Sequence, residues 1–108
     1  MKDNSVYLNH ILEAIAKIEK YIKGFDYDSF ESDDKTIDAV VRELEIVGEA
    51  AKHVSDSLKD EHPEIPWSKM MGIRNRLIHE YFGVNKKIIW ETCETDLPAL
   101  KKLITSLL

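Results

Sequence analysis

The ten residues 74–83, RNRLIHEYFG, gather several side chains that can act on a phosphate group. Histidine exchanges a proton near neutral pH, and arginine presents a planar fork of donors that fits a phosphate. Tyrosine adds a hydroxyl group and a ring on which a nucleobase can stack. The candidate functional residues of this stretch are Arg74, Asn75, Arg76, His79 and Tyr81.

These residue types suit the cleavage of RNA without a metal ion. A histidine acting as a base removes the proton of a ribose 2′-OH, and that oxygen attacks the adjacent phosphate. An arginine stabilises the negative charge of the transition state. Asn75 lies one helical turn before His79, where it can fix the tautomer of the ring or hold a ligand oxygen. The same residue types also occur on solvated helix faces and in interface networks, and their spacing leaves both interpretations open.

The geometry of a helix constrains how these side chains meet. At about 100° per residue, His79 lies roughly 40° from Asn75 but roughly 140° from Arg74. Arg74 and His79 of one straight helix therefore reach one small target only if the long arginine bends round. Alternatively, a two-fold axis beside the helix brings His79 of one chain to Arg74 of a second chain. Glu80 either orients a neighbouring arginine or is a solvated helix end.

Apolar residues at helical spacing predict the elements that hold this stretch. One stripe covers residues 8–22, a longer one covers 37–58, and a last one covers 85–107. Between them, a third helix should run from about Trp67 to Tyr81 or Phe82.

Capping and breaking residues set the predicted ends of these helices. Gly24 should end the first helix, and Gly83 the third. Ser32 or Asp33 should cap the second. Pro98 should either kink the last helix or restart it, since proline fits the first turn.

The predicted fold is all-α, an up-and-down bundle of four helices that forms a single domain over residues 1–108. No segment alternates with period two for long enough to predict a strand. Four amphipathic helices on so short a chain leave apolar surface uncovered, which favours a homodimer.

Composition narrows the class of protein. The chain is 44% hydrophobic and 32% charged, as expected for a globular protein, and no apolar run is long enough to span a bilayer. The N-terminus lacks a signal-peptide pattern, so we expect a cytoplasmic protein without a membrane partner. The net charge is −5, but residues 67–87 alone carry +4. A basic segment in an acidic protein can still face a phosphate backbone.

Several further residues carry expectations. No histidines and carboxylates have metal-ligand spacing, so no metal site is predicted. Cys93 should be a small buried side chain, and His53 should lie at the surface. Gly48 should permit a close approach of two helices. Lys86 and Lys87 either extend a phosphate-binding track or belong to a plain helix surface.

The sequence resembles the HEPN-domain toxins of the HepT-like family. Arg74, His79 and Tyr81 match the R-x4-H-x-Y pattern, within a signature-like block, IPWSKMMGIRNRLIHEYFGVN. The segments IVGEAAKHVS and IWETCETDLPALKKLI are also similar to that family, so the resemblance covers nearly the whole chain.

This resemblance implies a fold, an activity and a partner. The fold would be a HEPN four-helix bundle forming a homodimer, with the active cleft at the two-fold axis. The activity would be that of a metal-independent endoribonuclease, the toxin of a HEPN/MNT (type VII) toxin–antitoxin pair, acting on RNA such as tRNA or mRNA. Arg74 and His79 would be the catalytic pair, and Asn75, Arg76 and Tyr81 would support RNA binding.

Tyr81 would also be the tyrosine that the antitoxin modifies. The antitoxin of such pairs is an MNT-type nucleotidyltransferase, MntA, which uses ATP and magnesium to attach AMP. The toxin chain itself would need no cofactor. AMP adds bulk and negative charge, which should exclude a phosphate ligand. The alternative functions are a non-catalytic nucleotide-binding or adaptor module that partners a nucleotidyltransferase, and a purely structural dimerisation bundle.

Overall fold

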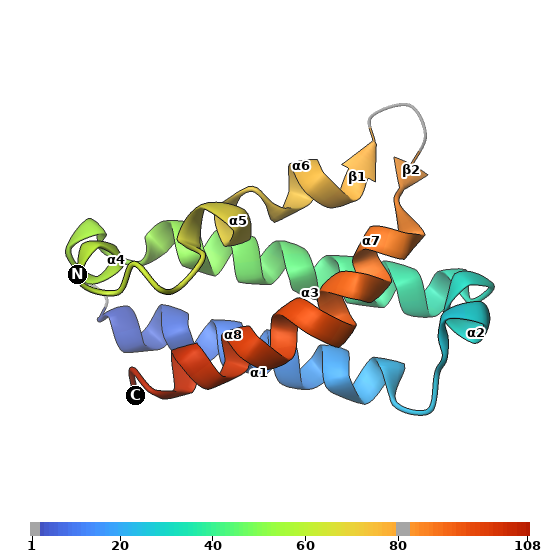
Figure 1. Ribbon diagram of the computed structural model, residues 1–108, viewed down its shortest axis with the longest axis horizontal. Helices are drawn as coiled ribbons and strands as arrows, with labels where there is room; N and C mark the ends of the chain where they lie inside the picture. Colours follow the sequence, from blue (N-terminus) through green and yellow to red (C-terminus); the bar gives the residue numbers. More distant parts are fainter. Residues whose placement is uncertain (1–2, 80–82) are drawn as a thin grey trace.

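The computed structural model describes residues 3–79 and 83–108, and for Ile78, His79 and Val84 it describes the backbone alone. The described chain is mostly helical (Figure 1). No helix in these ranges is long and apolar enough to cross a membrane.

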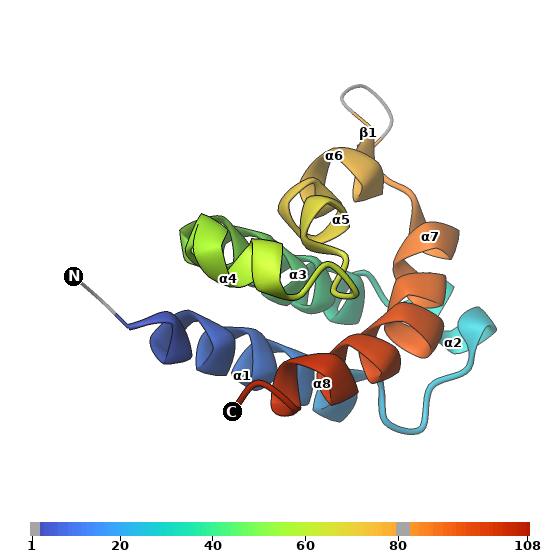
Figure 2. The same ribbon diagram turned by 60° about the vertical axis from the view of Figure 1, so that its left-hand side comes forward.

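Two long helices, α1 (Asn4–Ile22) and α3 (Asp34–His53), pack against each other, with α3 above α1 in Figure 2. Gly24 follows α1 with φ of +84°, a left-handed conformation that suits glycine and confirms the predicted stop. Asp33 caps α3 by accepting a hydrogen bond from the backbone N–H of Thr36. That cap confirms one of the two predicted alternatives.

A short helix, α2 (Tyr27–Glu31), lies between α1 and α3, where no helix was predicted. Asp26 and Ser29 form a reciprocal capping box at its start. The aromatic ring of Phe30 is fully buried and packs at 5.0 Å from the ring of Trp90. Five residues of helix are therefore stabilised by a cap and one buried side chain.

Helix α3, which was predicted as the second helix, ends at His53. This is five residues before the predicted end of its apolar stripe at residue 58. The backbone N–H of Ser55 donates to the side chain of Asn4 at 2.9 Å, and the Asn4 amide donates back to the Ser55 hydroxyl at 2.9 Å. The same hydroxyl caps a separate helix, α4 (Asp56–Glu61), by accepting from Leu58. The contact with Asn4 of α1 and the cap by Ser55 thus favour a new helix over continuation of α3.

The predicted third helix is interrupted at Gly72 and is wrong at Ile78 and His79. The structure has α5 (Trp67–Met71) and α6 (Ile73–Leu77), and then the strands β1 (Ile78–His79) and β2 (Gly83–Val84). The strands pair antiparallel, with His79 opposite Gly83.

One contact favours the hairpin over a longer helix. The carbonyl of Leu77 accepts from the backbone N–H of Asn85 at 2.8 Å, so it is engaged by a residue beyond the hairpin. Gly83, which was expected to end this helix, is instead the first residue of β2 and has φ of +75°. Residues 80–82, on which the predicted helix end fell, lie outside the described residues.

The last helical segment consists of α7 (Lys86–Glu91), a π-helical turn η1 (Thr92–Asp96) and α8 (Leu97–Thr105). Asn85 caps α7 through Ile88, confirming the predicted start. Pro98 lies in the first turn of α8, confirming the predicted restart. Proline has no N–H to donate to the carbonyl of residue 94, and the chain widens to a π turn just before it.

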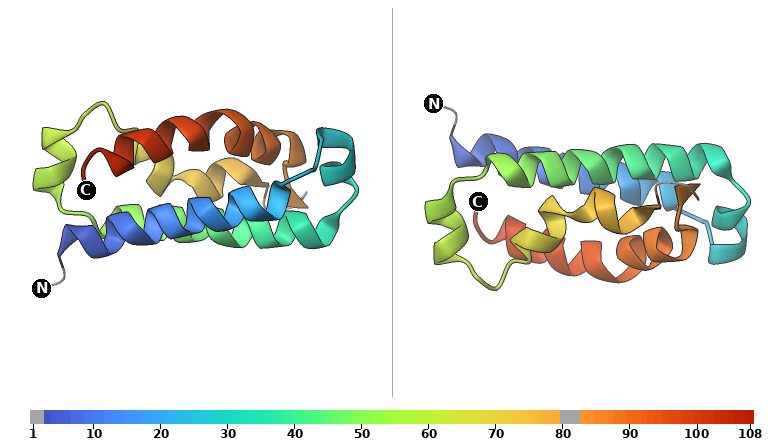
Figure 3. Two further views of the ribbon diagram at one scale, coloured as in Figure 1. Left: turned by 90° about the horizontal axis from the view of Figure 1, so that it is seen from below. Right: turned by 90° about the horizontal axis from the view of Figure 1, so that it is seen from above.

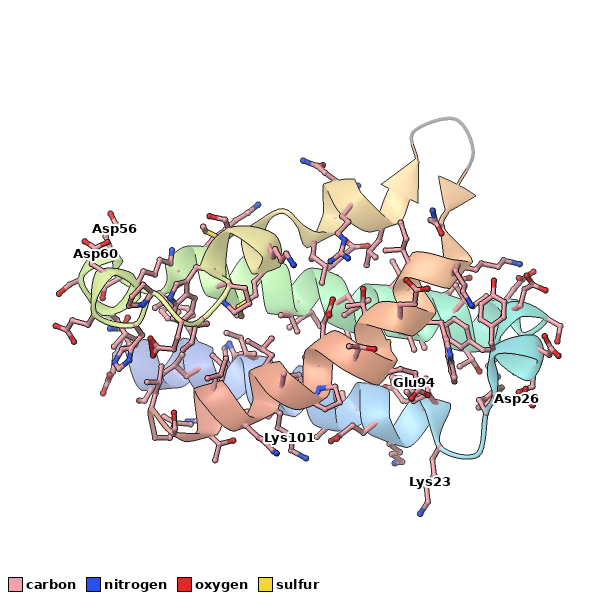
Figure 4. All side chains as sticks on the ribbon, in the orientation of Figure 1. Lys23, Asp26, Asp56, Asp60, Glu94 and Lys101 are labelled. Atoms are coloured by element: carbon pink, nitrogen blue, oxygen red, sulfur yellow. The ribbon has the colours of Figure 1, made fainter. Side chains whose placement is uncertain are left out.

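The helices surround one apolar core. In Figure 3, α5 and α6 lie over the space between α3 and the last helical segment, while α8 also contacts α1. The largest fully buried side chains are Ile11, Ile15, Ile18, Phe30, Ile37, Val40, Leu44, Val47, Leu77, Ile89 and Ile104. Lys101, at the edge of α8 in Figure 4, forms a 3.0 Å ion pair with Glu19 of α1.

Candidate functional site

Gly48 of α3 is where the α5–α6 segment approaches most closely. A Cβ atom on Gly48 would lie 2.8 Å from the carbonyl oxygen of Met70 and 3.0 Å from a methyl carbon of Ile73. Real Cβ atoms do not tolerate such distances to backbone. The prediction of a close helix approach is confirmed, and it fixes the position of Arg74, the residue after Ile73.

Arg74 is exposed and lines a small hollow of about 140 Å³ between α6 and α3. Three charged residues of α3, Glu45, Glu49 and Lys52, line the same hollow. Gly48 and Ile73 form its apolar floor, at the closest approach of the two segments. The predicted phosphate-binding arginine thus lies next to the close contact at Gly48 and shares a hollow with carboxylates of a neighbouring helix.

Arg76 faces a different part of the molecule. Its guanidinium Nη1 lies 3.5 Å from a carboxylate oxygen of Asp96 in η1. It lines a larger hollow of about 270 Å³ whose wall is mainly apolar and comes from α3, α5 and α8. Asn75, between the two arginines, is exposed. The structure therefore separates Arg74 from Arg76 and places them in two different hollows.

His79 does not belong to the helix that carries Arg74. Its backbone is paired with Gly83 in the hairpin, so the helical angle of about 140° between His79 and Arg74 does not apply. Of His79 the structure describes the backbone. Tyr81 and Glu80 lie outside the described residues.

Lys86 and Lys87 both contact the region around α2. The ammonium of Lys86 donates to the carbonyl oxygen of Glu31 at 3.0 Å and lies 3.5 Å from the carboxylate of Asp34. The ammonium of Lys87 lies 4.4 Å from the centre of the Tyr27 ring, a cation–π distance. These contacts favour a structural role over an extended phosphate track.

The charged residues of α3 that line the hollow beside Arg74 were not predicted to lie there. Residues 45, 49 and 52 recur at i, i+4 and i+7, so they share one face of α3, and Gly48 lies next to that face. Charged residues at this spacing, beside a glycine that allows another helix to approach closely, could have indicated that they belong near the site. His53 is exposed as predicted and stacks on Tyr7, with 5.2 Å between ring centres.

Cys93 is buried, as predicted. Burial raises the pKa of its thiol to about 12, and the neighbouring Glu94 charge adds to the shift. Within residues 3–79 and 83–108, no three histidine, cysteine or acidic side chains are grouped as a metal site.

The chain matches the family model described as "Ribonuclease HepT-like" over residues 11–107. It is 41% identical over 108 residues to a protein named as a putative RNase from Caldanaerobacter subterraneus subsp. tengcongensis, covering 100% of this chain and 96% of that relative. It is 46% identical over 95 residues to a protein named as a probable ribonuclease HepT from Thermococcus cleftensis, covering 88% of this chain and 86% of the relative.

A third relative, named as a putative RNase from Methanocaldococcus jannaschii, is 36% identical over 101 residues, covering 94% of this chain and 93% of the relative. No solved structure matches the chain.

Proposed function

The chain belongs to the ribonuclease HepT-like family, and on that premise we propose that it is a metal-independent endoribonuclease and the toxin of a HEPN/MNT toxin–antitoxin pair. The observation that carries the proposal is the family match over residues 11–107, which includes the R-x4-H-x-Y pattern. The exposed position of Arg74, next to the close contact at Gly48, supports it.

The proposed reaction is a transesterification within the RNA strand. His79 removes the proton of a ribose 2′-OH, and the oxygen attacks the adjacent phosphorus. The bond from phosphorus to the 5′ oxygen breaks, that oxygen takes up a proton, and a 2′,3′-cyclic phosphate remains. Arg74 stabilises the additional charge on the phosphate oxygens. DNA is spared because it lacks the 2′-OH.

Asn75, Arg76 and Tyr81 are proposed to bind the RNA, which is tRNA or mRNA. Arg76 must then exchange its contact with Asp96 for a phosphate, and this exchange is easy because both side chains are largely exposed. An exposed ion pair with a distance of 3.5 Å contributes little to stability, so it does not prevent the arginine from turning toward a phosphate.

The proposed assembly and regulation follow the family. Two chains, each a HEPN-type four-helix bundle, form a cytoplasmic homodimer with the cleft at the two-fold axis. The antitoxin MntA, a nucleotidyltransferase that uses ATP and magnesium, attaches AMP to Tyr81. The added phosphate repels an RNA phosphate from the site.

The test is cleavage of a mixed RNA pool that includes tRNA, in excess EDTA, by the unmodified parent protein. His79→Ala should abolish cleavage, whereas His10→Ala, which changes an exposed histidine of α1, should not. Parent-level cleavage by His79→Ala would contradict the assigned base. Absence of cleavage by the parent, with an intact mass showing no modification, would favour the nucleotide-binding or adaptor alternative.

A further inference from the structure

The chain direction of two neighbouring segments brings Arg74 and Glu45 to the same hollow. In Figure 1, α3 runs from α2 toward α4, and the α5–α6 segment returns in the opposite direction above it. The two segments touch at Gly48, against Met70 and Ile73. Arg74 is the residue after Ile73, and Glu45 lies one turn before Gly48 in α3. Because the two segments are antiparallel, both residues lie on the same side of that contact. Both side chains line the 140 Å³ hollow.

Glu49, the second carboxylate of the hollow, is directed along its own helix. One of its oxygens lies 3.7 Å from the ammonium of Lys52, and the other lies 3.5 Å from Nε2 of His53. Its side chain is 66% exposed. Glu45 lies one turn earlier and is half-buried. The less solvated carboxylate interacts more strongly with a nearby guanidinium, because water screens it less.

We infer that Glu45 is a positioning residue for Arg74, an inference that rests on the proposed ribonuclease function. A guanidinium has five N–H donors in a planar fork, so a carboxylate can hold one edge while the other edge faces a phosphate. In the described structure the two side chains share the hollow without a direct ion pair, so the exposed guanidinium of Arg74 must turn toward Glu45 to be held in the orientation that the transition state requires. Small errors in such positioning reduce catalytic rates strongly.

The kinetic test compares Glu45→Gln with Glu49→Gln, the same change one helical turn away. Glu45→Gln should lower kcat for RNA cleavage by about tenfold and change KM by less than about twofold, because orientation matters most in the transition state. Glu49→Gln should retain the parent kcat, and Glu45→Asp should recover part of the loss. Added to Arg74→Lys, Glu45→Gln should cause no further loss, since Glu45 acts through the arginine fork.

A second measurement does not depend on activity. The ¹⁵N-labelled Nε–H signal of Arg74 should shift in Glu45→Gln and stay in place in Glu49→Gln, with thermal melting confirming that both variants fold. If the parent cleaves no RNA, the proposed function fails, and this signal still decides whether Glu45 holds Arg74. An unmoved Arg74 signal, a parent-like kcat in Glu45→Gln, or equal effects of the two glutamine variants would overturn the inference.

Discussion

Arg74 and Arg76 are two residues apart, yet they meet different surroundings. Arg74 enters a hollow bounded by charged side chains of α3, whereas Arg76 pairs with Asp96 beside a mainly apolar hollow. Two positions along a helix rotate a side chain by about 200°, so this separation follows directly from helical geometry. The two arginines of the motif should therefore not be treated as one interchangeable cationic patch.

Cys93 supplies a prediction about pH. Its pKa in the folded protein is about 12, above the usual value of 9.0, because burial disfavours the thiolate. The thiol therefore stabilises the fold fully below about pH 9, and this contribution is lost as the pH rises from there toward 12. At pH 8, a thiol reagent should react slowly with native protein and rapidly in denaturant. Rapid labelling of native protein would contradict the burial of Cys93.

The matched control is Cys93→Ala. Above about pH 9, the free energy of unfolding of this variant should fall less steeply than that of the parent, because the variant has no thiol to ionise. An identical decline in both proteins above pH 9 would show that the thiol does not titrate differently in the folded and unfolded states.

At the scale of elements, Gly48 is the contact on which the site depends. Gly48→Ala places a methyl group 2.8 Å from the Met70 carbonyl oxygen, so α5 and α6 must move away from α3. Overpacking of this kind costs about 1–3 kcal/mol, measurable by urea unfolding. Asp38→Ala, at an exposed position of α3, should change stability by less than about 0.5 kcal/mol. Equal stability of the two variants would refute the close approach.

Signals that act within a few residues were readable from the sequence. The cap at Asp33, the start of α7 after Asn85 and the restart at Pro98 are set by neighbouring residues and were predicted correctly. The ends of the second and third helices were wrong, because contacts from outside each helix decide them. Asn4 engages the backbone of Ser55 across the fold, and Asn85 engages Leu77.

The features of the candidate site also divide into those set by neighbouring residues and those set by contacts between distant parts of the chain. The close approach at Gly48 follows from the local pattern and was predicted. The placement of Glu45 in the same hollow depends on how two antiparallel segments are seated, and helical spacing alone contains no such information. The hairpin at His79 was missed because its strands are two residues long, too short for an alternating pattern.

At the scale of the whole molecule, the basic segment 67–87 is less available to a ligand than its net charge of +4 suggests. Lys86 and Lys87 are engaged with α2 and the start of α3, and Arg76 with η1. The ionic contacts that RNA can gain therefore begin with Arg74 and Lys69, and Arg76 joins them by exchanging its exposed contact with Asp96.

The proposed two-fold cleft predicts complementation between inactive chains. If Arg74 of one chain serves His79 of the other, mixing and reassociating Arg74→Ala and His79→Ala proteins creates heterodimers with one intact site each. Random pairing should restore about a quarter of the parent cleavage rate. The measurement is RNA cleavage after co-refolding, with the unmixed variants as controls. Absence of recovery, with heterodimers shown by mass, would place both residues of a site in one chain.

The π turn Thr92–Asp96 has a consequence for chain length. Each such turn holds one residue more than an α-helical turn, and here it lies between buried Ile89 and buried Leu97. In a regular helix these two side chains would point about 80° apart. The wider turn reduces this angle, so that Ile89 of α7 and Leu97 of α8 face the same core. A homologue one residue shorter should carry its gap within these five positions, where a straight helix keeps both ends on the core.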